Sequence, residues 1–446
     1  MKYLSLIVVA LSFSFGGQAG AQMQAVPATD REALSQPMSG LTLAEMKLFQ
    51  QGRSLFRQSW VVAPAGDTEV HGLGPLYNRL ACISCHAKNG RGGAPGEPQQ
   101  RMQSMLVRLS VAGQDEHGGP KPHPAYGDQL NEEGIPGVPG EGRAQIHWRT
   151  SRVKLADGER VELRRPRIEF AELAYGPLGS VLVSPRVSPH VGGMGLLETV
   201  PADALQQLVR QAKPDGVRGM VNQVWDRPSG QRAVGRFGLK ANAPTLRQQI
   251  AGAFLGDMGI TSDLFPKENC TVVQLACQNA VSGGHPELKT AQLDAVEFYL
   301  AHLAPPARRD ADLPLVRQGE ALFATSGCVA CHQPVLPGGE HPKYPRLSGQ
   351  TVAAYSDLLV HDMGPDLADG RPDYLANGQQ WRTAPLWGLG LLAGINEQTS
   401  FLHDGRARTV QEAILWHGGE AATARKRYVQ LPKDKRQALL AFLQSL

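Results

Sequence analysis

Two short stretches, ACISCHAKNG at residues 81–90 and GCVACHQP at residues 327–334, decide how the rest of the sequence is interpreted. In each, two cysteines stand three positions apart and a histidine follows the second one: Cys82, Cys85 and His86, then Cys328, Cys331 and His332. C-x-x-C-H is the attachment signature of c-type haem, because one helical turn presents both thiols to the vinyl groups of one porphyrin and the histidine to its iron. We therefore expect two covalently bound haems.

Other uses of cysteine pairs fit these stretches less well. A structural zinc site places its second pair about 15–20 residues from the first, whereas these two pairs stand far apart in the chain. A thioredoxin-like motif follows a strand in a βαβ unit, a context that both stretches lack. The remaining pair, Cys270 and Cys277, has no adjacent histidine. In an oxidising compartment we expect it to form a local disulfide, with a redox-active dithiol as the alternative.

The N-terminus has the layout of a secretory signal. Lys2 supplies the positive start, residues 4–15 form an apolar run, and Ala19-Gly20-Ala21 offers a cleavage site. The run is too short to span a bilayer comfortably, although an uncleaved anchor is the alternative. We expect cleavage of residues 1–21 and an exported, periplasmic protein with no membrane span in the mature chain. The small net charge of +4 argues against a nucleic-acid partner.

A short internal repeat indicates duplication. QGRSLF at residues 51–56 precedes the first haem motif and QGEALF at 318–323 precedes the second, each resembling a helix that packs on a haem. The stretch HLAPPARRDADLP, residues 302–314, has the composition of a linker. We expect a mainly α fold with two cytochrome c-like haem domains, at residues 22–301 and 315–446. The first carries a long Gly/Pro-rich, partly β insertion at about residues 95–235, including a hairpin that turns at Asp157-Gly158.

The C-terminal stretch FLHDGRARTVQEAILWHGG, residues 401–419, contains two histidines of uncertain role, His403 and His417. Thr409 and Glu412 form a capping-box pattern, so a helix begins at about Val410 and ends at Gly418-Gly419. His417 falls on the inward face of that helix, where it is either a core histidine or a haem ligand.

The combined motifs resemble the bacterial di-haem cytochrome c peroxidase superfamily, and more closely its di-haem oxidoreductases of the peroxidase or thiol oxidoreductase type. The resemblance is carried by both C-x-x-C-H motifs, WRTAPLWGLG (381–390), FLHDGRARTVQEAILWHGGEA (401–421) and FGLKANAPTLRQQIAGAFLGDMGITS (237–262). Most of residues 95–235 lie outside it.

The resemblance implies roles for several residues. His417 occupies the position of the sixth ligand of the C-terminal haem, which is methionine in the peroxidases, and the change to histidine would lower that haem's potential. His403 is then a neighbour that orients the haem surroundings. Thr383 and Pro385 match positions whose carbonyls hold an interdomain calcium ion.

Peroxide cleavage needs an acid–base group beside an open iron position. The peroxidases place a glutamate ten residues after a glutamine. Here Gln249 matches the glutamine, but Gly259 stands at the glutamate position. Asp257 and Glu198 are the candidates for that role, and a turn aspartate is the alternative for Asp257. The sixth position of the N-terminal haem has four candidates: His71, His190, Met194 and Met258. Arg91, just after the first haem motif, is either a partner of a haem propionate or a solvated loop residue.

Together these features predict a periplasmic di-haem c-type oxidoreductase. Electrons from a small redox protein or another donor would enter at the C-terminal haem and pass to the N-terminal haem, which would reduce peroxide or another small oxidant. One alternative is a non-catalytic di-haem electron-transfer protein. Another is an oxidoreductase that acts on a thiol or a protein substrate.

Overall fold

The computed structural model describes residues 23–446, so the expected signal peptide, residues 1–21, lies outside the described part of the chain. The fold is mixed, with helices as the framework and strands mainly between residues 105 and 234. The helices are α1 Leu43–Arg57, α2 Met194–Thr199, α3 Ala202–Arg210, α4 Leu246–Met258, α5 Leu275–Gln278, α6 Thr290–Ala301, α7 Pro314–Thr325, α8 Leu392–Ile395, α9 Val410–Trp416, α10 Ala422–Gln430 and α11 Lys433–Ser445. The strands are β1 Leu76–Tyr77, β2 Met105–Gln114, β3 Pro120–Lys121, β4 Glu133–Gly134, β5 Arg143–Lys154, β6 Arg160–Ala171, β7 Leu182–Val187, β8 Gln223–Asp226, β9 Gln231–Val234, β10 Leu336–Pro337, β11 Thr351–Val352, β12 Val360–Asp362 and β13 Gln380–Arg382.

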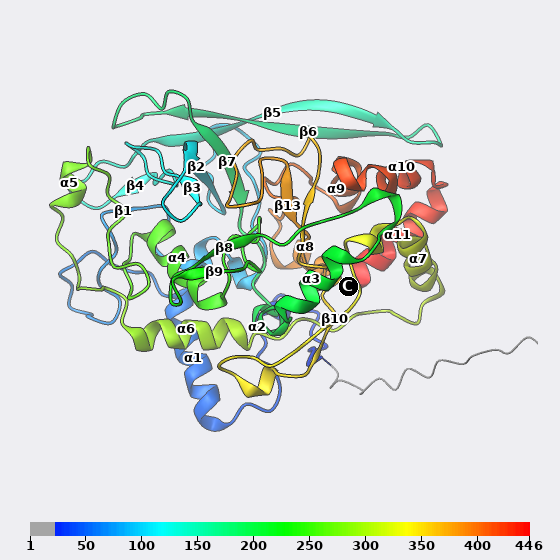
Figure 1. Ribbon diagram of the computed structural model, residues 1–446, viewed down its shortest axis with the longest axis horizontal. Coiled ribbons are helices and arrows are strands. Elements are labelled where there is room, and N and C mark those ends of the chain that lie inside the picture. Colours follow the sequence, from blue (N-terminus) through cyan, green and yellow to red (C-terminus); the bar gives the residue numbers. More distant parts are fainter. Residues whose placement is uncertain (1–22) are drawn as a thin grey trace, which may run out of the picture.

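Two helix pairs of the same construction form the framework: α1 crosses α6, and α7 crosses α11 (Figure 1). In each crossing the glycine of the QG repeat lies against the partner backbone. A Cβ on Gly52 would stand 1.9 Å from the carbonyl oxygen of Ala295, and a Cβ on Gly319 would stand 1.9 Å from that of Ala438. The repeated glycine therefore permits the close approach of each helix pair.

In both halves of the chain, one haem motif follows the first helix of the pair and lies against it in the same arrangement. Phe56, at the end of the first repeat, lies 6.2 Å from His86 between ring centroids, and Phe323 lies 6.3 Å from His332. The cysteine pairs begin short 3-10 turns at Cys82–Ser84 and Cys328–Ala330. The two halves of the sequence thus build two similar local structures, as the repeat predicts.

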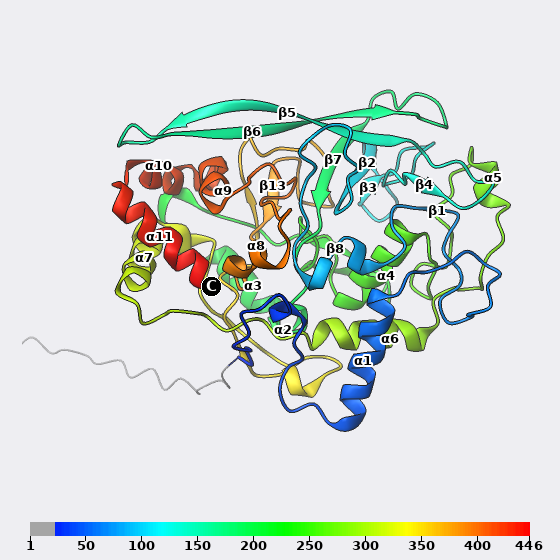
Figure 2. The ribbon, with the colours of Figure 1, turned by 180° about the vertical axis from the view of Figure 1, so that it is seen from behind.

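A long two-stranded ribbon, β5–β6, runs over both halves of the molecule (Figures 1 and 2). Ala144 and Ile146 near its open end belong to a core formed with β2 and β7. Leu155 and Leu163 near its turn belong to the core around α7, α9 and α11. The buried residues of β5, Ala144 and Ile146, are even-numbered, whereas Leu163 of β6 pairs with the odd-numbered Ser151. Opposite faces of the twisted ribbon therefore meet the two cores.

Several local predictions are confirmed. The hairpin turns at Gly158, whose φ is +90°. Cys270 and Cys277 form a disulfide. Helix α9 begins after Thr409, whose hydroxyl accepts the Glu412 amide, although the Glu412 carboxylate accepts from Arg408 and not from the cap. Among residues 23–446, no helix is both long and apolar enough to cross a membrane.

The structure adds detail in one region and differs from the sequence prediction in another. Besides its strands, the inserted segment contains α2 and α3, and Leu196 and Leu197 of α2 lie in the largest core. The expected linker is solvent-facing only in its second half. His302 to Pro306 are buried, and Leu303 pairs with Pro37 across an isolated bridge. The apolar start of this segment is therefore part of the core.

The glycine crossings can be tested by adding one methyl group. Gly319→Ala should lower the free energy of unfolding by about 1–3 kcal/mol, because the new Cβ overlaps a backbone carbonyl that cannot rotate away. Gly252→Ala, in the interior of α4, meets only the Phe265 ring at 3.7 Å and should be neutral or stabilising by up to about 1 kcal/mol. Urea unfolding of both holoproteins, followed by circular dichroism, measures the difference. Equal effects would contradict the close crossing.

Candidate functional site

Both C-x-x-C-H motifs line one continuous cavity of about 490 Å³. All six motif residues contribute to its wall, together with α4, β13 and α9. Cofactor sites of proteins typically occupy about 300–1,000 Å³ and are mostly apolar with few polar groups. The two motifs, which are far apart in the sequence, therefore open into the same interior space.

The two motif histidines are held in the same way. Nδ1 of His86 donates to the Pro189 carbonyl at 2.7 Å, and Nδ1 of His332 donates to the Tyr355 carbonyl at 2.9 Å. This bond fixes the tautomer, leaving the Nε2 lone pair of each ring free for a metal. Burial lowers the pKa of both imidazoles to about 4, so both are neutral, as metal ligation requires.

The four motif cysteines carry free thiols. Burial raises the pKa of Cys82, Cys85 and Cys328 to about 12, so these are not the exposed thiolates of a redox-active dithiol. No group of three or more His, Cys, Asp or Glu side chains in the described chain is arranged to hold a metal ion. Thiols beside a cavity, with an imidazole aimed into it, fit covalent porphyrin attachment.

His417 repeats the geometry of the two motif histidines. Its Nδ1 donates to the Ala413 carbonyl at 2.7 Å, and its ring lines the cavity. Burial lowers the pKa of His332, and the charge of His417 lowers it further, so the two imidazoles lie near one another. Helix α9 ends at Trp416, and His417 is the C-cap residue that directly follows it, whereas the sequence pattern placed His417 within the helix.

His403 has a different environment. Its ring stacks on Trp381 with a centroid distance of 3.6 Å and an interplanar angle of 9°. Its Nε2 lies 3.3 Å from the carboxylate of Asp404, which Arg406 also binds. The His403 ring is therefore engaged on one face and at one nitrogen, and it positions Trp381 at the cavity wall.

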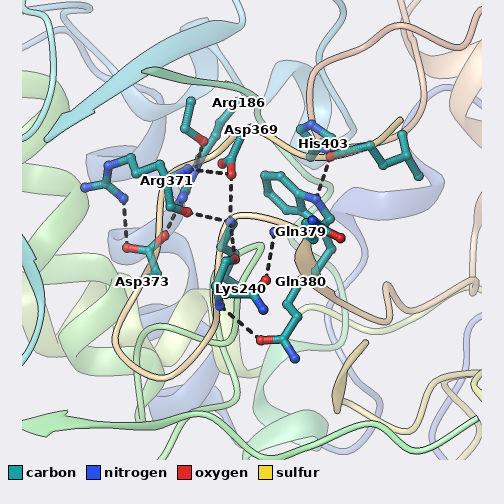
Figure 3. A network of polar contacts seen from close by, with 12 residues as sticks. Arg186, Lys240, Asp369, Arg371, Asp373, Gln379, Gln380 and His403 are labelled. Carbon is teal, nitrogen blue, oxygen red and sulfur yellow. Dashed lines mark hydrogen bonds and ion pairs between the residues drawn. The ribbon is translucent and has the colours of Figure 1, made fainter. Parts of the chain in front are cut away.

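A network of buried charged side chains surrounds Lys240 (Figure 3). The sequence did not predict this network. The fully buried ammonium of Lys240 binds Asp369 at 2.9 Å and lies 4.3 Å from the Trp381 ring centroid. Arg186 and Arg371 share Asp373. Burial lowers the pKa of Lys240 to about 8. Because these partners come from distant segments, no local sequence pattern could have identified the network.

The three predicted catalytic residues are not brought together. Asp257 and Gln249 lie on the face of α4 that lines the cavity. Asp257 Oδ1 accepts from the Gln129 amide at 3.0 Å, and burial raises the pKa of this carboxyl. Glu198 lies outside the cavity wall, where its Oε1 accepts the Leu246 amide at 2.9 Å. Glu198 therefore supports the start of α4 and is not placed to reach a substrate in this cavity.

The candidates for the N-terminal haem's sixth position are narrowed. His190, Met194 and Met258 line the cavity, and His71 does not. The His190 ring is hydrogen bonded to the Pro385 carbonyl, and its Nδ1 has no partner among the described residues. His190 directly follows Pro189, which orients His86. His190 therefore lies in the cavity near His86 with one ring nitrogen free, and it remains a candidate sixth ligand together with Met194 and Met258.

The predicted calcium position does not fit a metal ion well. The Thr383 carbonyl accepts from the Ser356 hydroxyl at 2.7 Å, and the Pro385 carbonyl accepts from His190. Calcium needs six to eight oxygen ligands, but these two carbonyls are already engaged. Calcium binding remains a prediction of the resemblance alone.

Comparison with known proteins identifies the family. The family described as "Di-haem oxidoreductase, putative peroxidase" matches residues 16–446. A search of curated proteins finds no match. A hydrazine synthase structure from Kuenenia stuttgartiensis is 14% identical, covering 99% of this chain and 100% of that chain at a TM-score of 0.37. A MauG-like protein associated with microbial copper homeostasis is also 14% identical, covering 51% of this chain and 79% of that chain at a TM-score of 0.30.

Structural likenesses at these TM-scores carry no argument about fold or activity. The family match spans nearly the whole chain, including both haem motifs and the 95–235 region that the sequence motifs left outside the resemblance. This chain belongs to the di-haem oxidoreductase family.

Proposed function

We propose that the protein is a di-haem c-type oxidoreductase that reduces peroxide or another small oxidant. The observation that carries this proposal is the single cavity into which both C-x-x-C-H motifs open. Cys82 and Cys85 would hold one haem covalently, and Cys328 and Cys331 the other, with His86 and His332 as proximal ligands. The indole N–H of Trp387 and the hydroxyl of Tyr428 belong to residues that line the same cavity, and neither has a hydrogen-bond partner among the described residues. These free polar groups support a cofactor with polar substituents in the cavity.

The two haem positions would differ in coordination. His332 and His417 present free Nε2 atoms to the same space, which would close the C-terminal iron on both sides. On the side of His86, the residues His190, Met194 and Met258 line the cavity, and the proposal is that none of them closes the N-terminal iron while the oxidant is reduced. When bound, the haems would carry electrons from a donor at the closed C-terminal site to the open N-terminal site, where the oxidant is reduced. An asymmetric pair of this kind suits an enzyme better than a simple electron carrier.

Asp257 is the residue proposed to handle protons. Reduction of hydrogen peroxide consumes two electrons and two protons and yields two water molecules. Gln129 fixes the Asp257 carboxylate, and its raised pKa favours holding a proton before releasing it. Position 259, where the peroxidases have glutamate, ends α4 with a φ of +67°, and a Cβ there would stand 2.5 Å from the Leu76 carbonyl oxygen. Only glycine fits, so the acid–base role falls to α4 itself.

The cellular location, the domain boundaries and the electron donor are proposed from the sequence. The protein would be exported to the periplasm after loss of residues 1–21, would have cytochrome c-like domains at 22–301 and 315–446, and would receive electrons from a small redox protein. The second candidate function is electron transfer without a substrate. It is favoured by Met194 and Met258, which line the cavity and would close the N-terminal iron if either bound it. The structure offers no specific observation for a thiol or protein substrate.

Replacement of the proposed sixth ligand tests the C-terminal assignment. His417→Met should raise the midpoint potential of one haem and leave the other unchanged, because histidine-methionine ligation favours the ferrous state relative to two histidines. His403→Phe keeps a ring to stack on Trp381 and should leave both ligand sets intact. Optical redox titration of the holoproteins measures both. A ligand change in the His403 variant alone would show that the assignment is wrong.

Peroxide turnover tests the proton-transfer role. Asp257→Asn should lower kcat for hydrogen peroxide by about 10²–10⁴-fold, the usual contribution of a positioned acid–base group. Glu198→Gln preserves the acceptor for the Leu246 amide outside the cavity and should retain wild-type turnover. Steady-state peroxide consumption with a reduced viologen dye as donor gives both rates. Equal rates in the two variants would remove Asp257 from the mechanism, and no turnover in the wild type would favour electron transfer alone.

A further inference from the structure

Two arginines reach the cavity from opposite halves of the chain. Arg91 follows the first haem motif, and its guanidinium donates to the carbonyls of Ser400 and Leu402. Arg382 ends β13, where its Nε donates to the Gly238 carbonyl at 2.9 Å. Both side chains are partly buried and line the cavity.

Neither guanidinium has a carboxylate partner within ion-pair distance among residues 23–446. Two of the other arginines on the cavity wall do: Arg108 binds Asp128 at 2.7 Å, and Arg186 pairs with Asp373, whereas Arg79 donates to backbone carbonyls alone. A partly buried cation without a counter-ion in contact is costly, so a negatively charged ligand would stabilise the site. Burial lowers the pKa of Arg91 and Arg382 to about 10, and the charges of Asp404 and Asp357 offset this effect only in part.

The two cations gather at the same place. Burial lowers the pKa of His190 to about 4, and the charges of Arg91 and Arg382 lower it further, so both guanidiniums lie near that ring. His190 follows Pro189, whose carbonyl holds His86. Both guanidiniums therefore lie near His190, which directly follows the residue that holds His86.

We propose that Arg91 and Arg382 form a carboxylate-binding site that receives haem propionates. The inference rests on the proposed covalent haem attachment and deepens it. A guanidinium presents parallel N–H donors that match a carboxylate, and each arginine has donors beyond those that its backbone carbonyls accept. The family resemblance predicts a calcium ion at Thr383 and Pro385. Arg382 directly precedes Thr383, so its guanidinium supplies a positive charge next to that predicted calcium position.

Redox titration of the holoprotein tests this site. Arg91→Gln and Arg382→Gln should each lower the midpoint potential of at least one haem, because losing a nearby positive charge favours the ferric state. Lysine at either position keeps the charge without the forked contact, so it should give a smaller shift. The matched control is Arg164→Gln. Arg164 also donates to two backbone carbonyls, those of Gly405 and Arg406, without an ion-pair partner, but it lies outside the cavity.

Shifts in the glutamine variants that exceed the Arg164→Gln shift, and that shrink with lysine, would support the site. Potentials equal to that control would overturn it. If a glutamine variant does not mature, Arg91→Lys and Arg382→Lys decide, since unchanged potentials in both would contradict the site. The test needs no peroxide turnover, so it is independent of the enzyme's substrate. Absence of haem absorbance in the purified wild type would instead overturn the proposed function.

Discussion

The hydrogen bond from a histidine Nδ1 to a backbone carbonyl is the interaction on which the site depends. On the cavity wall it occurs at His86, His332 and His417, and each time it directs the free Nε2 toward the cavity. An imidazole that lost this bond could rotate or change tautomer, and its affinity for iron would fall. The fold therefore has to place three carbonyls accurately: those of Pro189 and Tyr355 in irregular loops, and that of Ala413 in the last turn of α9.

The framework that holds these carbonyls combines close packing with buried charge. The glycine crossings set the distance between helices in each pair, and the β5–β6 ribbon joins the cores of both halves. Behind the cavity wall, Lys240 and Asp369 fix the loop that leads to Trp381. Such buried pairs contribute little net stability compared with apolar packing, but removing one partner leaves an uncompensated charge. Their expected role here is to keep the wall in one position.

The sequence predicts features that depend on neighbouring residues and misses those that depend on tertiary contacts. The haem motifs, the Cys270–Cys277 disulfide and the hairpin at Gly158 are local patterns with local causes. The position of Glu198 outside the cavity wall could not be predicted, because its hydrogen bond to the start of α4 joins segments far apart in the chain. The buried start of the expected linker was missed because proline and charge suggested solvent exposure for all of it. The QG repeat was recognised, but the reason for its glycine appeared only in the helix crossings.

The central claim is that one haem is closed by two histidines and the other is open. Electron paramagnetic resonance of the holoprotein, oxidised and half-reduced, tests it most directly. We expect a low-spin signal from the site of His332 and His417, and a high-spin, five-coordinate signal from the site of His86 once the protein is half-reduced. Two low-spin haems in every state would contradict the open site and leave electron transfer as the function.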